Sequence, residues 1–179
     1  DIKIIAPLHG AVLDENLSHY ISLYDTWSSF KPETNGVAIA YASLHGNTAK
    51  FAKEIEKKFI EKGIQCRTFD LSREDLSEAV EYAFKFSKTI FASSTYDGGI
   101  FSPMKDLLSR LEAKTWQNRD VAIIENGTWG PIAGKKIKET LETFKDIKVR
   151  DEIITIKSTP SSENYAQIDS LVEWAKNGN

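Results

Sequence analysis

Three short segments of the chain carry most of the side chains that could do chemistry. Each follows an apolar run and combines hydroxyl or amide side chains with glycine. The first segment lies directly before a helical pattern, so its backbone N–H groups could bind an anion at a helix N-terminus. It contains no Lys or Arg, and a phosphate would therefore be held by neutral donors, although such a loop can equally be a simple helix cap. Its residues are Ser43, Leu44, His45, Gly46, Asn47 and Thr48.

The second and third segments add an aromatic side chain to the same mixture. Hydroxyl groups and bare backbone suit the edge of a hydrogen-bonding heterocycle, and Tyr96 and Trp129 suit its flat faces. The Walker pattern and the Gly-x-Gly-x-x-Gly pattern are both absent, so ATP, GTP and NAD are not the first candidates. The candidate binding residues here are Ser94, Thr95, Tyr96, Asp97, Gly98 and Gly99, followed by Asn126, Gly127, Thr128, Trp129 and Gly130.

The elements that must position these segments alternate along residues 37–179. Short apolar runs predict strands, and the segments between them show apolar residues at helical spacing. Strands separated by helices predict an α/β fold, a five-stranded parallel sheet covered on both faces. All three polar segments then lie at the carboxyl edge of the sheet, where ligands bind in such folds. The expected strands are 37–42, 64–69, 89–93, 121–125 and 153–156, and the expected helices are 48–62, 74–86, 104–111, 135–144 and 165–176.

Residues 1–35 stand outside this alternation. Residues 2–5 could form a strand, and residues 28–35 look like a linker. Between them an apolar stripe at helical spacing predicts a helix that must cover an apolar surface. We therefore expect an N-terminal extension over residues 1–35 and a domain over residues 36–179. The stripe consists of Leu17, Tyr20, Ile21, Tyr24 and Trp27.

Composition excludes several classes of function. The 179 residues are 41% hydrophobic and 27% charged, with a net charge of −3, so a folded domain without a nucleic-acid-binding stripe is expected. No stretch approaches 18 consecutive apolar residues, and we expect no membrane contact. The single cysteine, Cys66, excludes an intrachain disulfide and fits a reducing, cytoplasmic compartment, where it would be a small core residue. The three histidines lack metal-site spacing, so no metal site within this chain is expected.

Residues 37–179 resemble a flavodoxin-like domain that binds FMN. The run SLHGNT over residues 43–48 resembles the Ser/Thr-x-Thr-Gly-Asn-Thr phosphate loop of that family, with His45 where Thr is common. The runs ASSTYDGGIFSPM and NGTWG are similar, more narrowly, to the flavodoxin domain of A-type flavoproteins, the flavodiiron oxygen or nitric oxide reductases. Asp97 stands where Asn is usual in that group. The resemblance implies a flavodoxin-like sheet in the order 2-1-3-4-5, FMN as the cofactor and the three segments as its site.

The N-terminal run IAPLHG over residues 5–10 is similar to the end of the metallo-β-lactamase-like domain that precedes the flavodoxin domain in flavodiiron proteins. His9 would match the final diiron ligand, but the other ligands are not in this chain. Residues 1–35 are then a remnant of that domain.

The resemblance implies an electron-transfer domain. Its acceptor would be a diiron domain, usually in the facing subunit of a head-to-tail homo-oligomer. Its donor would be a redox protein such as rubredoxin, or an NAD(P)H reductase. The alternative is a stand-alone FMN-dependent NAD(P)H:quinone-type reductase, which needs a substrate pocket above the flavin. A domain that has lost its flavin is a third alternative, disfavoured by the intact glycines and hydroxyls.

Overall fold

A parallel β-sheet forms the centre of the computed structural model, which describes residues 2–177. Its strands lie in the order β2-β1-β3-β5-β6, and β7 also pairs with β5. All of these pairings are parallel, and only the two-residue β4 pairs antiparallel, with β3. This order confirms the predicted flavodoxin-like fold. The strands are β1 (Thr34–Ala42), β2 (Cys66–Asp70), β3 (Phe86–Tyr96), β4 (Gly99–Ile100), β5 (Arg119–Asn126), β6 (Ile147–Val149) and β7 (Ile154–Ile156).

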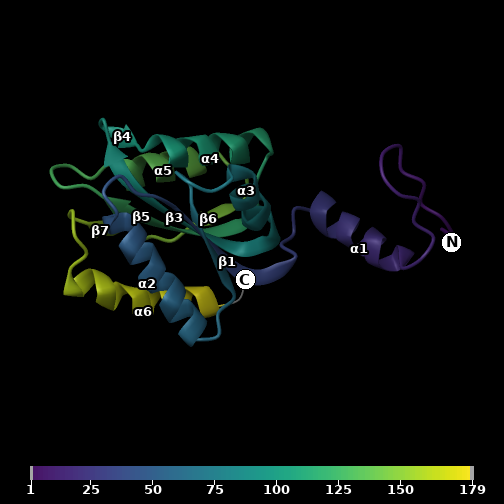
Figure 1. The fold of residues 1–179 in the computed structure, drawn as a ribbon, viewed down its shortest axis with the longest axis horizontal. Helices are drawn as coiled ribbons and strands as arrows, with labels where there is room; N and C mark the ends of the chain where they lie inside the picture. Colours follow the sequence, from purple (N-terminus) through teal and green to yellow (C-terminus); the bar gives the residue numbers. More distant parts are fainter. Residues whose placement is uncertain (1, 178–179) are drawn as a thin grey trace.

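Helices cover both faces of the sheet (Figure 1). The alternation of β1 separates two cores: Val37, Ile39 and Tyr41 pack with α2 and α6, whereas Ala38 and Ala40 pack with the helices of the other face. The predicted doubly covered sheet is therefore confirmed. The helices of the domain are α2 (Asn47–Glu61), α3 (Leu76–Lys85), α4 (Ser102–Ala113), α5 (Ala133–Leu141) and α6 (Ser162–Lys176).

The observed strands differ from the expected ranges at one or both ends: β1 and β5 begin earlier than expected, at Thr34 and Arg119, and the third and fifth strands show the differences that matter most. The third strand was expected over residues 89–93, but β3 begins at Phe86, directly after α3 ends at Lys85. The sequence pattern did not reveal these first residues of β3, because the charged Lys88 interrupts the apolar run although it is buried. The Lys88 ammonium donates to the Asn177 carbonyl (2.9 Å) and lies 3.8 Å from the Asp120 carboxylate. The expected fifth strand, residues 153–156, corresponds to β7, and β6 is an additional strand that the sequence did not predict. The two strands pair with successive parts of β5.

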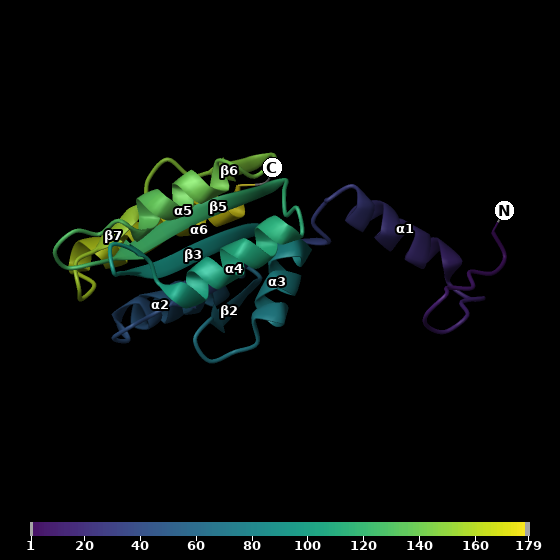
Figure 2. The same cartoon turned by 90° about the horizontal axis from the view of Figure 1, so that it is seen from above.

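The N-terminal extension projects away from the domain in both views (Figures 1 and 2). Its helix α1 (Leu17–Ser28) matches the apolar stripe but has no buried residue. The strand suggested for residues 2–5 is wrong, because the described residues there form only an isolated bridge between Ile5 and Leu13. None of the helices within residues 2–177 is long and apolar enough to cross a membrane.

The segment expected as a linker, residues 28–35, is attached to the domain at several points. The buried guanidinium of Arg119 donates to the Phe30 carbonyl (2.6 Å), and Glu33 N–H donates to the Lys85 carbonyl (2.9 Å). Thr34 then begins β1. Arg119 is bonded to carbonyl oxygens, and burial lowers its pKa to about 10. The extension is therefore fixed to the domain at its base, where Trp27 of α1 borders a pocket with Phe84 and Arg119, and the rest of α1 projects outward (Figures 1 and 2).

Candidate functional site

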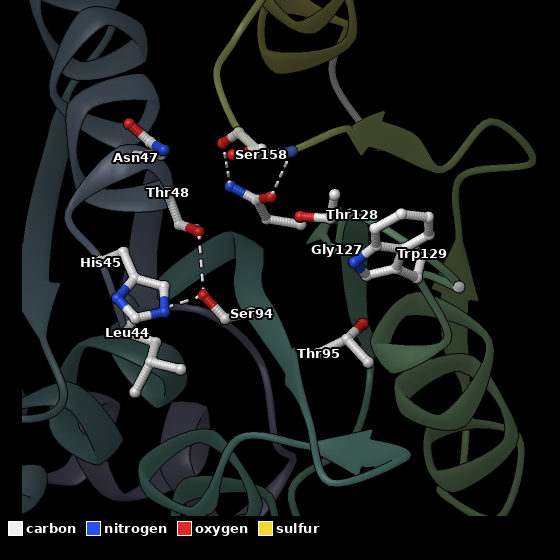
Figure 3. A pocket seen from close by; sticks show the side chains of 12 residues that line it. Leu44, His45, Asn47, Thr48, Ser94, Thr95, Gly127, Thr128, Trp129 and Ser158 are labelled. Carbon is white, nitrogen blue, oxygen red and sulfur yellow. Dashed lines mark hydrogen bonds between the residues drawn. The ribbon is translucent and has the colours of Figure 1, made fainter.

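A pocket of about 330 Å³ lies at the carboxyl ends of β1, β3, β5 and β7 (Figure 3). Its walls come from all three polar segments predicted from the sequence and from one that was not predicted. The described residues that line it are Leu44, His45, Asn47, Thr48, Ser94, Thr95, Asn126, Gly127, Thr128, Trp129, Gly130 and Ser158. Of the predicted residues, Ser43, Gly46, Tyr96, Asp97, Gly98 and Gly99 do not line it.

The first segment leads into an uncapped helix. Gly46 is the N-cap of α2, with φ +87°, and no side chain of the described residues caps the helix there. Ser43 accepts instead from Gly46 N–H (3.1 Å), within the turn. The first N–H groups of an α-helix have no acceptor within the helix. Because Asn47 and Thr48 line the pocket, these free donors and the positive end of the helix dipole are available to an anion there.

The helix on the other side of the site, α5, has three of its N-terminal N–H groups occupied by side chains. Thr95 Oγ1 accepts from Ile132 N–H (3.0 Å) and Ala133 N–H (3.1 Å). The buried carboxylate of Glu125 accepts from Gly134 N–H (2.8 Å). The α5 end therefore already holds a negative charge, and an anion entering the pocket is directed to α2.

Ser94 joins the first and second segments at the centre of the pocket. Its hydroxyl oxygen accepts from Leu44 N–H (3.3 Å) and lies 3.2 Å from the buried hydroxyl of Thr48 (Figure 3). This network fixes the path of the first segment relative to β3.

The second segment is a hairpin and not the expected loop. β3 continues to Tyr96, and Asp97 and Gly98 form a two-residue turn with φ values of +49° and +64°. Positive φ at both central positions is the type I′ pattern, for which Asp-Gly is a preferred pair. Tyr96 then pairs with Gly99. The residue is 53% exposed, and the centre of its ring lies 5.6 Å from the centre of the Phe101 ring. The hairpin borders a second, wider groove toward α4 and α5.

The third segment depends on close packing at Gly127. A Cβ atom there would lie 3.0 Å from Pro131 Cα and 3.2 Å from the Thr95 side chain. Trp129 lines the pocket although its side chain is 99% exposed, so it stands at the rim with no partner on its outer face in the described chain (Figure 3). Glycine at position 127 thus lets the backbone of the third segment pack against Pro131 and Thr95. The unpartnered ring of Trp129 remains available to a flat ligand.

Sequence reasoning missed a fourth segment, which follows β7 and contains Ser158. The Asn126 side chain amide donates to the Ser158 carbonyl (2.9 Å) and accepts from Ser158 N–H (3.1 Å). The signal was available, because residue 158 follows the fifth expected strand at the same edge of the sheet. It was overlooked because this segment lacks the glycine that marks the other three.

Cys66 and His9, which the sequence analysis also considered, lie outside the pocket. Cys66 was expected as a small core residue, and it is partly buried against the core at the start of β2. Burial raises the pKa of its thiol to about 11, with a smaller contribution from Glu56. His9 is exposed in the extension, and residues 2–177 contain no cluster of three metal-ligating side chains.

Comparison with known proteins identifies the family. The flavodoxin family model matches residues 39–165. A nitric oxide reductase of Moorella thermoacetica is 24% identical over 170 residues, which are 95% of this chain and 42% of that protein. The flavodiiron protein of Giardia intestinalis (TM-score 0.89, 20% identity) matches 98% of this chain and 44% of its own, and the rubredoxin:oxygen oxidoreductase of Desulfovibrio gigas (TM-score 0.84, 20% identity) matches 96% and 43%.

This chain thus spans less than half the length of these relatives. The model match starts inside β1 and ends in α6, and it includes every segment that lines the pocket. The fold is that of the matching part of the flavodiiron structures, and the chain therefore belongs to the flavodoxin family, whose domains bind FMN.

Proposed function

We propose that this chain is an electron-transfer module that holds FMN with its phosphate at the N-terminus of α2. The observation that carries the proposal is the contrast between two helix ends: α2 is uncapped, whereas Thr95 and Glu125 occupy the N–H groups of α5. A phosphate needs several donors, and hydrogen bonds to a charged group contribute about 1.5–3 kcal/mol each. The first-turn N–H groups of α2, with the one hydroxyl of the hydrogen-bonded Thr48–Ser94 pair whose proton stays free, supply such donors without a basic residue.

The remaining pocket suits the rest of the FMN molecule. We place the flavin ring toward Trp129 and Tyr96, the two exposed aromatic side chains of the predicted site. The hairpin turn at Asp97 and Gly98 would lie along one edge of the ring. FMN, when bound, accepts electrons from one partner and passes them to another. The protein residues bind it, orient it and adjust its potential.

Electron transfer is favoured over the quinone reductase alternative by the hairpin. Its turn has only two residues, so it forms no wall above the site, and Trp129 stands exposed at the rim. An electron-transfer protein needs an exposed flavin edge, whereas a reductase needs an enclosed substrate pocket. Turnover of NAD(P)H with a quinone by the purified FMN form would support the alternative.

We propose that residues 1–35 belong with a metallo-β-lactamase-like diiron domain, which would accept the electrons. The apolar face of α1 supports this, since Tyr24 is 64% exposed and Trp27, which borders a pocket with Phe84 of the flavodoxin domain, is still 47% exposed. The donor would be rubredoxin, which appears in the name of the Desulfovibrio gigas relative, or an NAD(P)H reductase. A head-to-tail homo-oligomer and a cytoplasmic location complete the proposal.

Cofactor identification tests the core of this proposal. The purified chain is incubated with equal amounts of FMN and FAD, washed, and heated, and the released flavin is identified by mass. We expect FMN, with a visible flavin spectrum before release. Release of FAD, or of no flavin, would refute the proposed function.

A further inference from the structure

Ser158 has an unusual backbone conformation for its residue type. Its φ is +67°, in the left-handed region, where residues other than glycine are strained. Ser158 is exposed, so core packing does not impose this conformation. Strain of this kind persists only where surrounding contacts hold it, and it is concentrated at functional sites.

The contacts that hold Ser158 are the two hydrogen bonds from Asn126. The side-chain amide donates to the Ser158 carbonyl and accepts from its N–H, at 2.9 and 3.1 Å. Both functional atoms of the Asn126 amide are thus used to fix the backbone of Ser158. The next residue, Thr159, closes the turn with a bond from its N–H to the Lys157 carbonyl (3.0 Å).

This arrangement leaves the Ser158 hydroxyl available to a ligand. Within residues 2–177 it has no hydrogen-bond partner, and Ser158 lines the same pocket as Asn47 and Thr48. Figure 3 shows Ser158 at the end of the pocket where Asn47 begins α2, away from Leu44. The hydroxyl therefore belongs to the same pocket as the uncapped end of α2.

We propose that Ser158 is a phosphate ligand from a fourth segment of the site, and that Asn126 is its positioning residue. The inference rests on the proposed placement of the FMN phosphate at α2. A phosphate dianion has three terminal oxygens that each accept more than one hydrogen bond, so donors from α2 on one side leave acceptor sites open on the other. A hydroxyl on that other side donates a hydrogen bond to the phosphate without adding a charge. The other proposed donors of the site, which are backbone N–H and hydroxyl groups, are neutral in the same way.

Two variants at position 158 separate a ligand role from a structural role. Ser158→Ala removes the hydroxyl and keeps the strain, whereas Ser158→Gly removes the hydroxyl and relieves the strain. Thr159→Ala is the matched control, because it removes an exposed hydroxyl one residue further along that does not line the pocket. Each apoprotein is titrated with FMN and with riboflavin, which lacks the phosphate, and its thermal unfolding is recorded.

We expect both Ser158 variants to bind FMN about 10- to 150-fold more weakly than the parent, the range for loss of one hydrogen bond to a charged group. Their affinity for riboflavin should not change, and Ser158→Gly should be at least as stable as the parent. Thr159→Ala should bind both flavins as the parent does.

Three other outcomes would overturn the inference. Unchanged FMN affinity in both Ser158 variants would show that the hydroxyl is not a ligand. An equal loss for FMN and riboflavin would move the contact to the ribityl chain or the ring. A loss in Ser158→Ala that Ser158→Gly restores would show a purely structural role. Failure of the parent to bind FMN would instead refute the proposed function, which keeps the two failures distinct.

Discussion

Replacing Gly46 by Ala tests whether the N-terminus of α2 binds the phosphate. Gly46 has φ +87°, and a Cβ atom there would meet nothing within 4 Å, so the cost of the substitution is backbone strain and not a clash. A side chain in the left-handed region costs about 1–2 kcal/mol. The unbound turn can relieve this strain by rotating, which turns its N–H groups away from the pocket. Binding of a phosphate must then restore the strained form, and FMN affinity should fall about 5- to 30-fold.

Gly63→Ala is the matched control at the other end of the same helix. Gly63 has φ +70°, and a Cβ atom there also meets nothing within 4 Å. We expect Gly63→Ala to lower the unfolding temperature of the apoprotein by about 2–8 °C, from 2–4 °C per kcal/mol at this chain length. Its FMN affinity should equal that of the parent. Both variants and the parent are titrated with FMN and with riboflavin by flavin fluorescence. If Gly46→Ala binds FMN as tightly as Gly63→Ala does, the phosphate does not bind at α2, and our reading of the pocket is wrong.

Three further predictions concern other parts of the chain. Thr95→Val should lower the unfolding free energy of the apoprotein by about 0.5–2 kcal/mol, because two N–H groups of α5 lose their acceptor; an unchanged urea midpoint would contradict this. Asp97→Asn keeps a residue that tolerates positive φ and removes a negative charge near the proposed flavin edge. The potential of the second electron should therefore rise by some tens of millivolts in a potentiometric titration. Potentials equal to the parent's would show that the hairpin does not lie beside the flavin. Because burial raises the Cys66 pKa from 9.0 to about 11, its alkylation rate should rise with a midpoint near pH 11, and stability should fall as pH rises through that interval; a rate midpoint near pH 9 would show an exposed thiol.

The pattern of the sequence determined the fold class and three of the four segments that line the pocket, and the strand order followed from the family resemblance. The reason is that the fold class and these segments depend on local patterns. Apolar runs and helical spacing define the elements, and glycine with hydroxyl side chains marks the turns that follow parallel strands. Residues 43–48 and 126–130 were identified in this way, and most of them meet in one pocket.

Only the tertiary structure decided how individual side chains are used. Thr95 resembles a ligand residue in sequence, yet its hydroxyl caps α5, because the end of β3 lies beside that helix. The buried charges of Lys88 and Arg119 obscured two strand starts, because their hydrogen-bond partners lie far away along the chain. The backbone of Ser158 is fixed at the pocket by a hydrogen bond from Asn126, which lies 32 residues earlier in the sequence. Hydrogen bonds between distant segments leave no local pattern, and the division between open and capped helix ends was therefore visible only once the chain was folded.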